Sequence, residues 1–244
     1  MKRRRTGVRK FGIEPMSDSA LLIEFGDRID EGINRLVQAA VSRLEADPFP
    51  GFVECIPSFA AMTVFYDPIR LQRSSGSGTA HGYVSTLVTE MLRSMEENVQ
   101  PAREVIDIPV CYGGEFGPDL AYVAELNGLD EAEVVKIHSS QDYLVYALGF
   151  APGFPYLGGM PASISAPRKA TPRLSIPAGS VGIAGTQTGI YPLETPGGWQ
   201  IIGRTPLALF RPEQDPPVLL RSGQYIRFSP IDASVYNRLA GGRG

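Results

Sequence analysis

The residues best suited to chemistry lie in and just before a glycine- and proline-rich segment that runs from Gly149 to Pro206. Glycine permits turns and close approaches that a Cβ atom would block, and proline fixes φ, so this segment is expected to fold into tight, ordered turns. Such turns commonly carry binding and catalytic groups. The polar side chains that could bind a substrate or transfer a proton are His138, Tyr143, Ser180, Gln187, Thr188 and Arg204. The aromatic side chains that could form a wall around it are Phe154, Tyr156 and Trp199.

Each of these candidates has a structural interpretation beside the functional one. An imidazole such as that of His138 could act as a general acid or base near neutral pH, or it could hold a loop in place. Arg168, Arg173 and Arg204 could each receive a carboxylate or a phosphate, or they could form surface ion pairs. Trp199, the only tryptophan, could belong to the core or provide a stacking platform. The residue types alone leave both interpretations open.

Familiar catalytic motifs are incomplete in this sequence. Ser180 lies in an Ala-Gly-Ser-Val-Gly run that is similar to a nucleophile elbow, but both histidines, His81 and His138, precede it, whereas an α/β-hydrolase needs a later one. The sequence has no Walker A motif, which excludes ordinary P-loop binding of ATP. Two lone histidines and the distant Cys55 and Cys111 do not have the spacing of a metal site, so we expect two buried free thiols.

The elements that must position these residues are predicted to form two domains. In residues 14–102, apolar patterns predict a strand over 16–26, a helix after Asp30, two strands over 52–56 and 62–66, and a second helix. A strand near Ile106 could close this unit. The order β-α-β-β-α is typical of a small ferredoxin-like α+β sandwich, with helices on one face of an antiparallel sheet.

Residues 103–244 have a different pattern. A strand over 104–110 is followed by two short helices, which we expect Asp119 and Asp130 to cap. Beyond Tyr143 come many short apolar runs, each bounded by glycine or proline. Short strands and turns at this spacing predict a β-barrel or sandwich with little helix. The predicted fold class is therefore α+β, with a small ferredoxin-like domain before a β-rich one.

Composition narrows the class of protein further. The 244 residues are 43% hydrophobic and 20% charged, as in a globular soluble protein, and the net charge of −3 gives no general attraction to nucleic acid or membranes. No apolar run is long enough to span a bilayer. Lysine and arginine crowd the first ten residues without a following signal-peptide core, so we expect residues 1–13 to be a disordered basic extension and the cytoplasm to be the compartment.

Several blocks in the same order resemble the Kip-inhibitor family, also called allophanate hydrolase subunit 1. They are Gly-Phe-Ala-Pro-Gly-Phe-Pro-Tyr-Leu-Gly-Gly at 149–159, the block at 177–192, and Thr-Pro-Gly-Gly-Trp-Gln-Ile-Ile-Gly-Arg-Thr-Pro at 195–206. The stretch at 109–120 and His138 also belong to the resemblance, which covers about residues 14–227. Long blocks in the right order make this resemblance specific.

The resemblance implies a small α+β domain followed by a cyclophilin-like β-barrel. It also implies a hydrolase component without activity of its own, which works in an ATP-dependent 5-oxoprolinase as the B subunit. With the C subunit (allophanate hydrolase subunit 2 family) as direct partner and the A subunit as third component, the complex would convert 5-oxo-L-proline to L-glutamate. Members of the family also imply two alternatives, namely a carboxyltransferase-type component of a biotin-dependent urea pathway and an inhibitor that binds a histidine kinase.

Under this resemblance the candidate residues take roles at the junction with the C subunit. We expect catalytic roles for His138, Tyr143 and Arg204. We expect substrate-binding roles for Phe154, Tyr156, Ser180, Gln187, Thr188 and Trp199. Backbone amides around 179–185 could donate hydrogen bonds to a developing oxyanion. ATP is used by the complex and is not assigned to this chain, and the partners are expected to supply the remaining groups.

Overall fold

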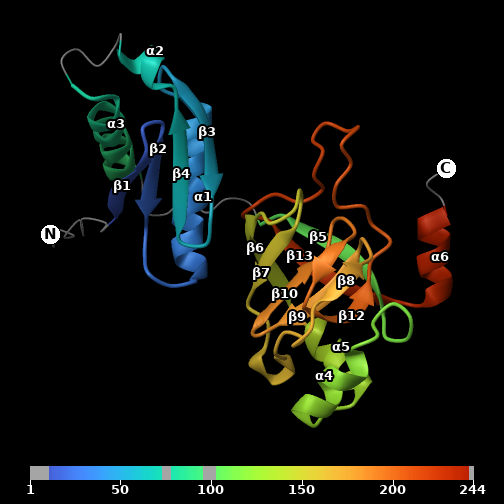
Figure 1. The fold of residues 1–244 in the computed structure, drawn as a ribbon. Coiled ribbons are helices and arrows are strands. Elements are labelled where there is room, and N and C mark those ends of the chain that lie inside the picture. Colours follow the sequence, from blue (N-terminus) through green and yellow to red (C-terminus); the bar gives the residue numbers. More distant parts are fainter. Residues whose placement is uncertain (1–10, 73–77, 96–102, 242–244) are drawn as a thin grey trace, which may run out of the picture. The chain divides into compact units, whose positions relative to one another are not determined.

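The computed structural model describes residues 11–72, 78–95 and 103–241 (Figure 1). The chain divides between residues 102 and 103 into two compact units. The expected basic extension lies outside the described residues for its first ten positions, and its last two, Gly12 and Ile13, belong to the first strand. Among the described residues, no helix is long and apolar enough to cross a membrane.

The N-terminal unit is a four-stranded antiparallel sheet with the order β1-β2-β4-β3. Its strands are β1 (Gly12–Ser17), β2 (Ala20–Glu24), β3 (Phe52–Pro57) and β4 (Ala61–Tyr66). Its helices are α1 (Glu31–Ala46), the short α2 (Pro68–Gln72) and α3 (Ala80–Ser94). Leu21 and Ile23 of β2 pack with Val37 of α1 and Val88 of α3, so both long helices cover the same face of the sheet.

The hairpin β1–β2 replaces the single strand that the sequence predicts over residues 16–26. The strand near Ile106, expected to close this unit, lies in the second unit instead, so that detail was wrong. In a ferredoxin-like order the strand beside β2 would come from the end of the unit. Here β1, from the start of the unit, occupies that edge of the sheet.

The second unit is built around a closed barrel with the strand order β10-β7-β6-β13-β5-β12-β9. These strands are β5 (Val105–Tyr112), β6 (Asp142–Leu148), β7 (Pro155–Gly158), β9 (Ser180–Ala184), β10 (Gln187–Ile190), β12 (Gln200–Arg204) and β13 (Tyr225–Ile231). A separate two-stranded ribbon pairs β8 (Arg173–Ile176) with β11 (Thr195–Gly197). The remaining elements are α4 (Leu120–Asn127), α5 (Glu131–His138), the 3₁₀ turn η1 (Ala162–Ile164) and α6 (Ala233–Gly241). The predicted α+β class with a β-barrel is confirmed.

The barrel unit has two apolar clusters on opposite sides of its strands. Val181 and Ile183 of β9 join the main core, whereas a Cβ at Gly182 between them would lie 3.1 Å from Trp199 Cβ on the other side. Trp199 belongs to a smaller cluster with Phe154 and Tyr191. Because side chains alternate along a strand, the main cluster fills the inside of the barrel and the aromatic cluster lies outside it.

Both cysteines are free and buried, as the sequence predicts. Burial raises the pKa of the Cys55 thiol to about 12, with Glu45 and Glu54 adding to the effect. Burial likewise raises the pKa of Cys111. Neither thiol is therefore activated as a nucleophile at neutral pH.

Candidate functional site

An aromatic pocket of about 360 Å³ opens on the outer side of the barrel. The aromatic residues that line it are Phe150, Phe154, Tyr156, Tyr191 and Trp199. Proline and glycine complete the lining, and Arg168 is the one charged residue among the lining side chains that the structure describes. The pocket therefore combines apolar walls with a single cation at an exposed position.

Phe154 holds the aromatic wall together. Its ring lies edge-to-face against Tyr156, Tyr191 and Trp199, with centroid distances of 5.1, 5.5 and 5.6 Å. Edge-to-face contacts of this kind stabilise a fixed arrangement of rings. Phe154 is buried, whereas Phe150 at the rim is 70% exposed and has a φ of 71°. The wall is thus rigid at its base and open at its rim.

Glycine forms the floor of the pocket because the rings lie almost on the backbone. A Cβ at Gly189 of β10 would lie 3.1 Å from Phe154 Cζ and 3.1 Å from Trp199 Cζ3. It would also lie 3.1 Å from the Pro155 carbonyl oxygen, which cannot move aside as a side chain could. The close approach of backbone and aromatic rings explains why glycine occupies this position.

The loop that carries Arg168 is fixed by a buried carboxylate. Asp119 is 5% exposed and accepts two hydrogen bonds from Arg173, each 2.7 Å long, and one from Lys169 at 3.1 Å. It also accepts a hydrogen bond of 2.7 Å from the Ile201 amide. Burial acts to raise the pKa of Asp119, but the hydrogen bonds from Arg173, the Ile201 amide and Lys169 outweigh it and lower the pKa below its ordinary value.

Asp119 therefore has a different role from the one that the sequence predicts. It occupies the N-cap position of α4, but its side chain makes no capping hydrogen bond. Instead it ties the segment around residues 169–173 to the beginning of α4 and to β12. The Lys169 amide adds a bond of 2.7 Å to the Gly198 carbonyl, so both sides of the pocket rim are joined.

His138 lies in a closed polar cluster inside the barrel. It has no exposed surface, and its Nδ1 lies 2.8 Å from the Tyr112 hydroxyl, while its Nε2 lies 2.9 Å from the Thr188 hydroxyl. Because the Thr188 hydroxyl donates to the Gly182 carbonyl at 3.1 Å, it accepts from Nε2–H, which leaves Nδ1 to accept from Tyr112. The Tyr143 hydroxyl donates to the His138 carbonyl at 2.7 Å.

This network accommodates a neutral imidazole with every polar atom bonded. Burial lowers the pKa of His138 from 6.5 to about 3, in keeping with the neutral form. Tyr143 and Thr188 are also without exposed surface. None of the three lines the aromatic pocket, so the structure places them behind its floor rather than in its wall.

Ser180 and Arg204 lie opposite each other on the neighbouring strands β9 and β12. Ser180 Oγ and Arg204 Nε are both shielded from solvent, and neither has a hydrogen-bond partner among the described residues. The Arg204 guanidinium lies 5.9 Å above the Phe116 ring. Gln187, at the beginning of β10, is half-buried. These three side chains do not line the pocket either.

The backbone amides expected to stabilise an oxyanion are already in use. The Gly179 amide donates to the Tyr191 carbonyl at 2.7 Å, and the Gly185 amide donates to the Ala166 carbonyl at 2.7 Å. The Ser180 amide donates to the Pro177 carbonyl at 3.2 Å. The expectation that this turn offers free donors was therefore wrong, because tight turns satisfy their own amides.

The nine predicted site residues thus fall into separate places. Phe154, Tyr156 and Trp199 meet in the pocket, whereas the others lie inside the barrel or along β9, β10 and β12. Sequence reasoning did not single out Arg168, Tyr191 or the anchor Asp119. Arg168 was one of three equivalent arginines, and nothing in the sequence shows which of them lies beside the aromatic wall.

The pocket has the chemistry to bind a small ring that carries a carboxylate. Aromatic faces pack against a ring, and a guanidinium pairs with a carboxylate through two parallel hydrogen bonds. The described residues contain no group of three or more side chains able to hold a metal ion. The pocket is therefore suited to binding and orientation, and a nucleophile or metal-bound water has to come from elsewhere.

Comparison with known proteins gives a consistent picture. Residues 11–220 match the family model described as carboxyltransferase domain, subdomain C and D. The chain is 53% identical over 230 residues to the B subunit of 5-oxoprolinase from Bacillus subtilis (strain 168), covering 93% of this chain and 96% of that protein. It is 43% identical over 223 residues to the B subunit of 5-oxoprolinase from Escherichia coli O157:H7, covering 90% of this chain and 96% of that protein.

Longer proteins contain the same region. The crystal structure of TTHA0988 superposes with a TM-score of 0.75 at 37% identity, covering 88% of this chain and 40% of that one, so this chain spans less than half of it. Urea amidolyase of Lachancea kluyveri is 22% identical over 253 residues, which cover 91% of this chain and 13% of that protein.

Proposed function

Because the chain belongs to the carboxyltransferase-domain family, subdomain C and D, we propose that it is the B subunit of an ATP-dependent 5-oxoprolinase and that its aromatic pocket binds 5-oxo-L-proline. The resemblance drawn from the sequence blocks is confirmed by the two relatives of that name. Both relatives match over nearly their whole length, which supports the same role for this chain.

The observation that carries the proposal is the pairing of Arg168 with the aromatic wall. 5-Oxo-L-proline is a flat five-membered lactam with one carboxylate. Its ring fits between aromatic faces such as those of Trp199 and Tyr156, and its carboxylate fits the guanidinium of Arg168. Arg168 forms no ion pair with any residue that the structure describes, so it is available for a ligand.

In this account the chain binds and orients the lactam, and its partners complete the reaction. The pocket offers no thiol, imidazole or carboxylate among its lining residues. ATP would phosphorylate the lactam oxygen, water would add at that carbon, and breakage of the ring C–N bond would give L-glutamate, phosphate and ADP. We assign ATP and the attacking water to the A and C subunits, because the turn at Gly179 is closed by the Thr205 carbonyl and has no room for a phosphate.

The buried residues then take positioning roles. The His138–Thr188 hydrogen bond fixes β10, and the next residue, Gly189, forms the pocket floor. Tyr143 holds the end of α5 through the His138 carbonyl. Arg204 remains a candidate for the junction with the C subunit, because it is partly exposed and its Nε lacks a partner among the described residues.

The proposal is tested by reconstituting the chain with the A and C subunits and measuring glutamate release from 5-oxo-L-proline and ATP. Arg168→Gln should raise KM by about tenfold to a hundredfold, the usual cost of losing a hydrogen-bonded charge pair, and leave kcat nearly unchanged. Arg168→Lys should recover part of that loss. Arg211→Gln, which removes an arginine that bonds Gln214 away from the pocket, serves as the matched control. An unchanged KM in Arg168→Gln would contradict the proposal.

The similarity to urea amidolyase favours one second candidate, a component that transfers a carboxyl group in a biotin-dependent urea pathway. This candidate would be favoured if the complex released no glutamate but transferred carboxylate from carboxybiotin to urea. The same pocket could then accept a planar amide. The histidine-kinase inhibitor expected as another alternative stays a prediction.

A further inference from the structure

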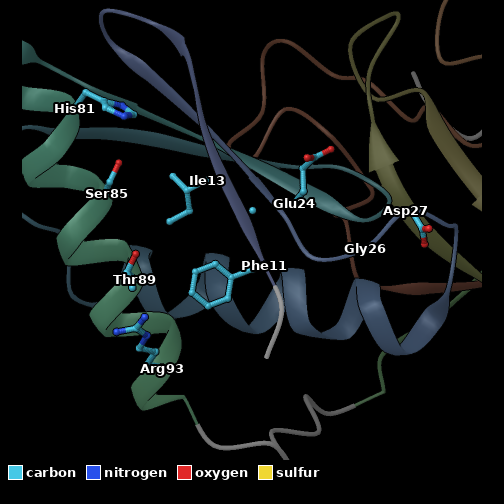
Figure 2. Close-up of a pocket in the computed structure, with 10 residues that line it drawn as sticks. Phe11, Ile13, Glu24, Gly26, Asp27, His81, Ser85, Thr89 and Arg93 are labelled. Atoms are coloured by element: carbon cyan, nitrogen blue, oxygen red, sulfur yellow. The ribbon is translucent and has the colours of Figure 1, made fainter. Parts of the chain in front are cut away.

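A long groove runs beside the edge strand β1 in the N-terminal unit, between that strand and helix α3 (Figure 2). It consists of two hollows of about 1060 and 540 Å³ that adjoin at His81, which lines both. The larger hollow extends toward Arg93, and the smaller one extends toward Asp18. The groove therefore follows the length of β1 and has no place in the function proposed for the barrel.

One wall of the groove is a polar stripe on α3. His81, Ser85, Thr89 and Arg93 are four residues apart, so they lie on one side of the helix (Figure 2). The neighbouring face of α3 places Val84, Val88 and Leu92 in the core with β2. Helix α3 thus packs over β2, and its polar stripe stands beside β1 with open space between them.

The opposite wall is a free sheet edge. Strand β1 is the outermost strand and pairs only with β2 among the described residues. Phe11 and Ile13 are partly buried and form the apolar floor of the groove. An edge strand offers unpaired amides and carbonyls to another extended chain. Pro15 and the irregular register after it leave the segment before Pro15 as the best surface for pairing.

Hydrogen-bonding groups and charges in the groove lack partners. His81 Nδ1 and Ser85 Oγ are shielded from solvent and bond to no residue that the structure describes. Such atoms destabilise a protein until a partner supplies the missing hydrogen bond. Arg93 and Glu24 form no ion pair within the described part of the chain. Glu24 Oε2 lies 3.7 Å from the position of a Cβ on Gly12, so its carboxylate reaches across β1 toward the free edge.

We propose that this groove binds an extended peptide segment of a partner protein, which adds to the free edge of β1 and places an acidic side chain against Arg93. Side chains of an added strand alternate between the face that α3 covers and the open face. A residue next to the acidic one therefore points to the open face, where a basic side chain meets Glu24. Strand addition beside a helix fixes the backbone by the sheet edge and selects the sequence by the helix wall.

The charges favour a peptide of this kind over a second copy of the chain. The α3 wall carries Arg93 and His81, and the strand side carries Glu24 and Asp27. A second copy would bring its own β1, in which Pro15 lacks the amide that strand pairing needs. A segment with alternating acidic and basic residues matches both walls at once.

The test uses the full chain and a fluorescein-labelled hexapeptide, Thr-Val-Lys-Glu-Thr-Val, which has no net charge from its side chains. Its two valines and its glutamate share one face, and its lysine and two threonines share the other. Fluorescence anisotropy should show saturable binding that is at least about fivefold tighter than binding of the peptide with lysine and glutamate exchanged. Arg93→Glu should invert this preference, and Arg35→Glu, on the exposed side of α1, should leave it unchanged.

Backbone pairing is tested with the same peptide methylated on alternate amides. One methylated register should lose binding and the other should keep it, because only one set of amides faces β1. Equal affinity for the two charge registers, an unchanged preference in Arg93→Glu, or no saturable binding up to about 1 mM would overturn the proposal. A dimer of the chain that dissociates on Arg93→Glu in sedimentation velocity would assign the groove to a second copy and would overturn it as well.

Discussion

Thr188 and Gly189 are neighbours on β10, yet they belong to two regions that differ in what they can do. Thr188 points into the barrel and shares a closed hydrogen-bond network with His138 and Tyr112. Gly189 forms the floor of the aromatic pocket outside, where Arg168 has no ion-pair partner among the described residues. The inside contains the more reactive residue types, but its polar atoms are already paired. Availability of a group, more than its type, separates a site from a core.

The largest effect should follow from opening the inner network. His138→Ala removes a buried ring and leaves the Tyr112 hydroxyl without its partner, so we expect the free energy of unfolding to fall by about 3 kcal/mol. Urea denaturation of the chain measures this. The other histidine provides the control, and His81→Ala should cost less than about 1 kcal/mol because its ring is only partly buried. A stable His138→Ala protein that has lost activity would move His138 from the core to the site.

The anchor of the pocket rim should give the next largest effect. Asp119→Asn removes the charge that pairs with Arg173 and Lys169, whose side chains are 29% and 31% exposed. Because these partners are partly solvated, we expect a loss of about 2 kcal/mol in unfolding free energy, below the range for fully buried pairs. The variant should also bind 5-oxo-L-proline more weakly, because the loop that carries Arg168 is released. Intact binding in a destabilised protein would show that the rim does not depend on Asp119.

A methyl group on the pocket floor should separate the two regions most sharply. In Gly189→Ala the new Cβ meets two rings and the Pro155 carbonyl, so we expect a cost of about 1–2 kcal/mol and a displaced Trp199. Thr188→Val, one residue away, should lower stability without changing the affinity of the folded protein for 5-oxo-L-proline. Denaturation and ligand titration of both variants measure the contrast. Equal effects of the two substitutions on affinity would break the distinction between inside and outside.

Acidification should reveal the inner region by the smallest and most gradual change. The pKa of His138 is lowered from 6.5 to about 3, so the unfolded chain binds a proton over this interval and the folded chain does not. Stability is then complete above about pH 6.5 and falls as the pH drops, by at most about 1.4 kcal/mol per pH unit. His138→Gln should remove this slope. The lowered pKa of Asp119 adds a separate loss that begins only below its ordinary value of 3.8.

The sequence predicts the architecture well where local pattern decides it. Apolar periodicity and glycine–proline punctuation indicate an α+β unit before a barrel, and the block around Phe154 and Trp199 indicates an aromatic wall. The edge position of β1 depends on pairing with β2 in preference to a strand from the end of the unit. No local pattern encodes that choice.

The site is less predictable because long-range partners decide the role of each residue. Asp119 looks like a helix cap, but Arg173, 54 residues later, captures its carboxylate. His138 looks like a general base, and its partner Thr188 lies 50 residues away. Arg168, Arg173 and Arg204 look alike in the sequence, yet one is free, one is paired and one lies over an aromatic ring.

The most direct test of the central claim uses Trp199, the only tryptophan, which lines the pocket and is 6% exposed. Its fluorescence is followed while 5-oxo-L-proline is titrated into the chain, alone and assembled with its partners, with Trp199→Phe as the background. The account predicts a saturable change in the wild type and a midpoint raised by at least about tenfold in Arg168→Gln. A fluorescence that stays constant at substrate concentrations that saturate turnover, or an identical midpoint in Arg168→Gln, would contradict it.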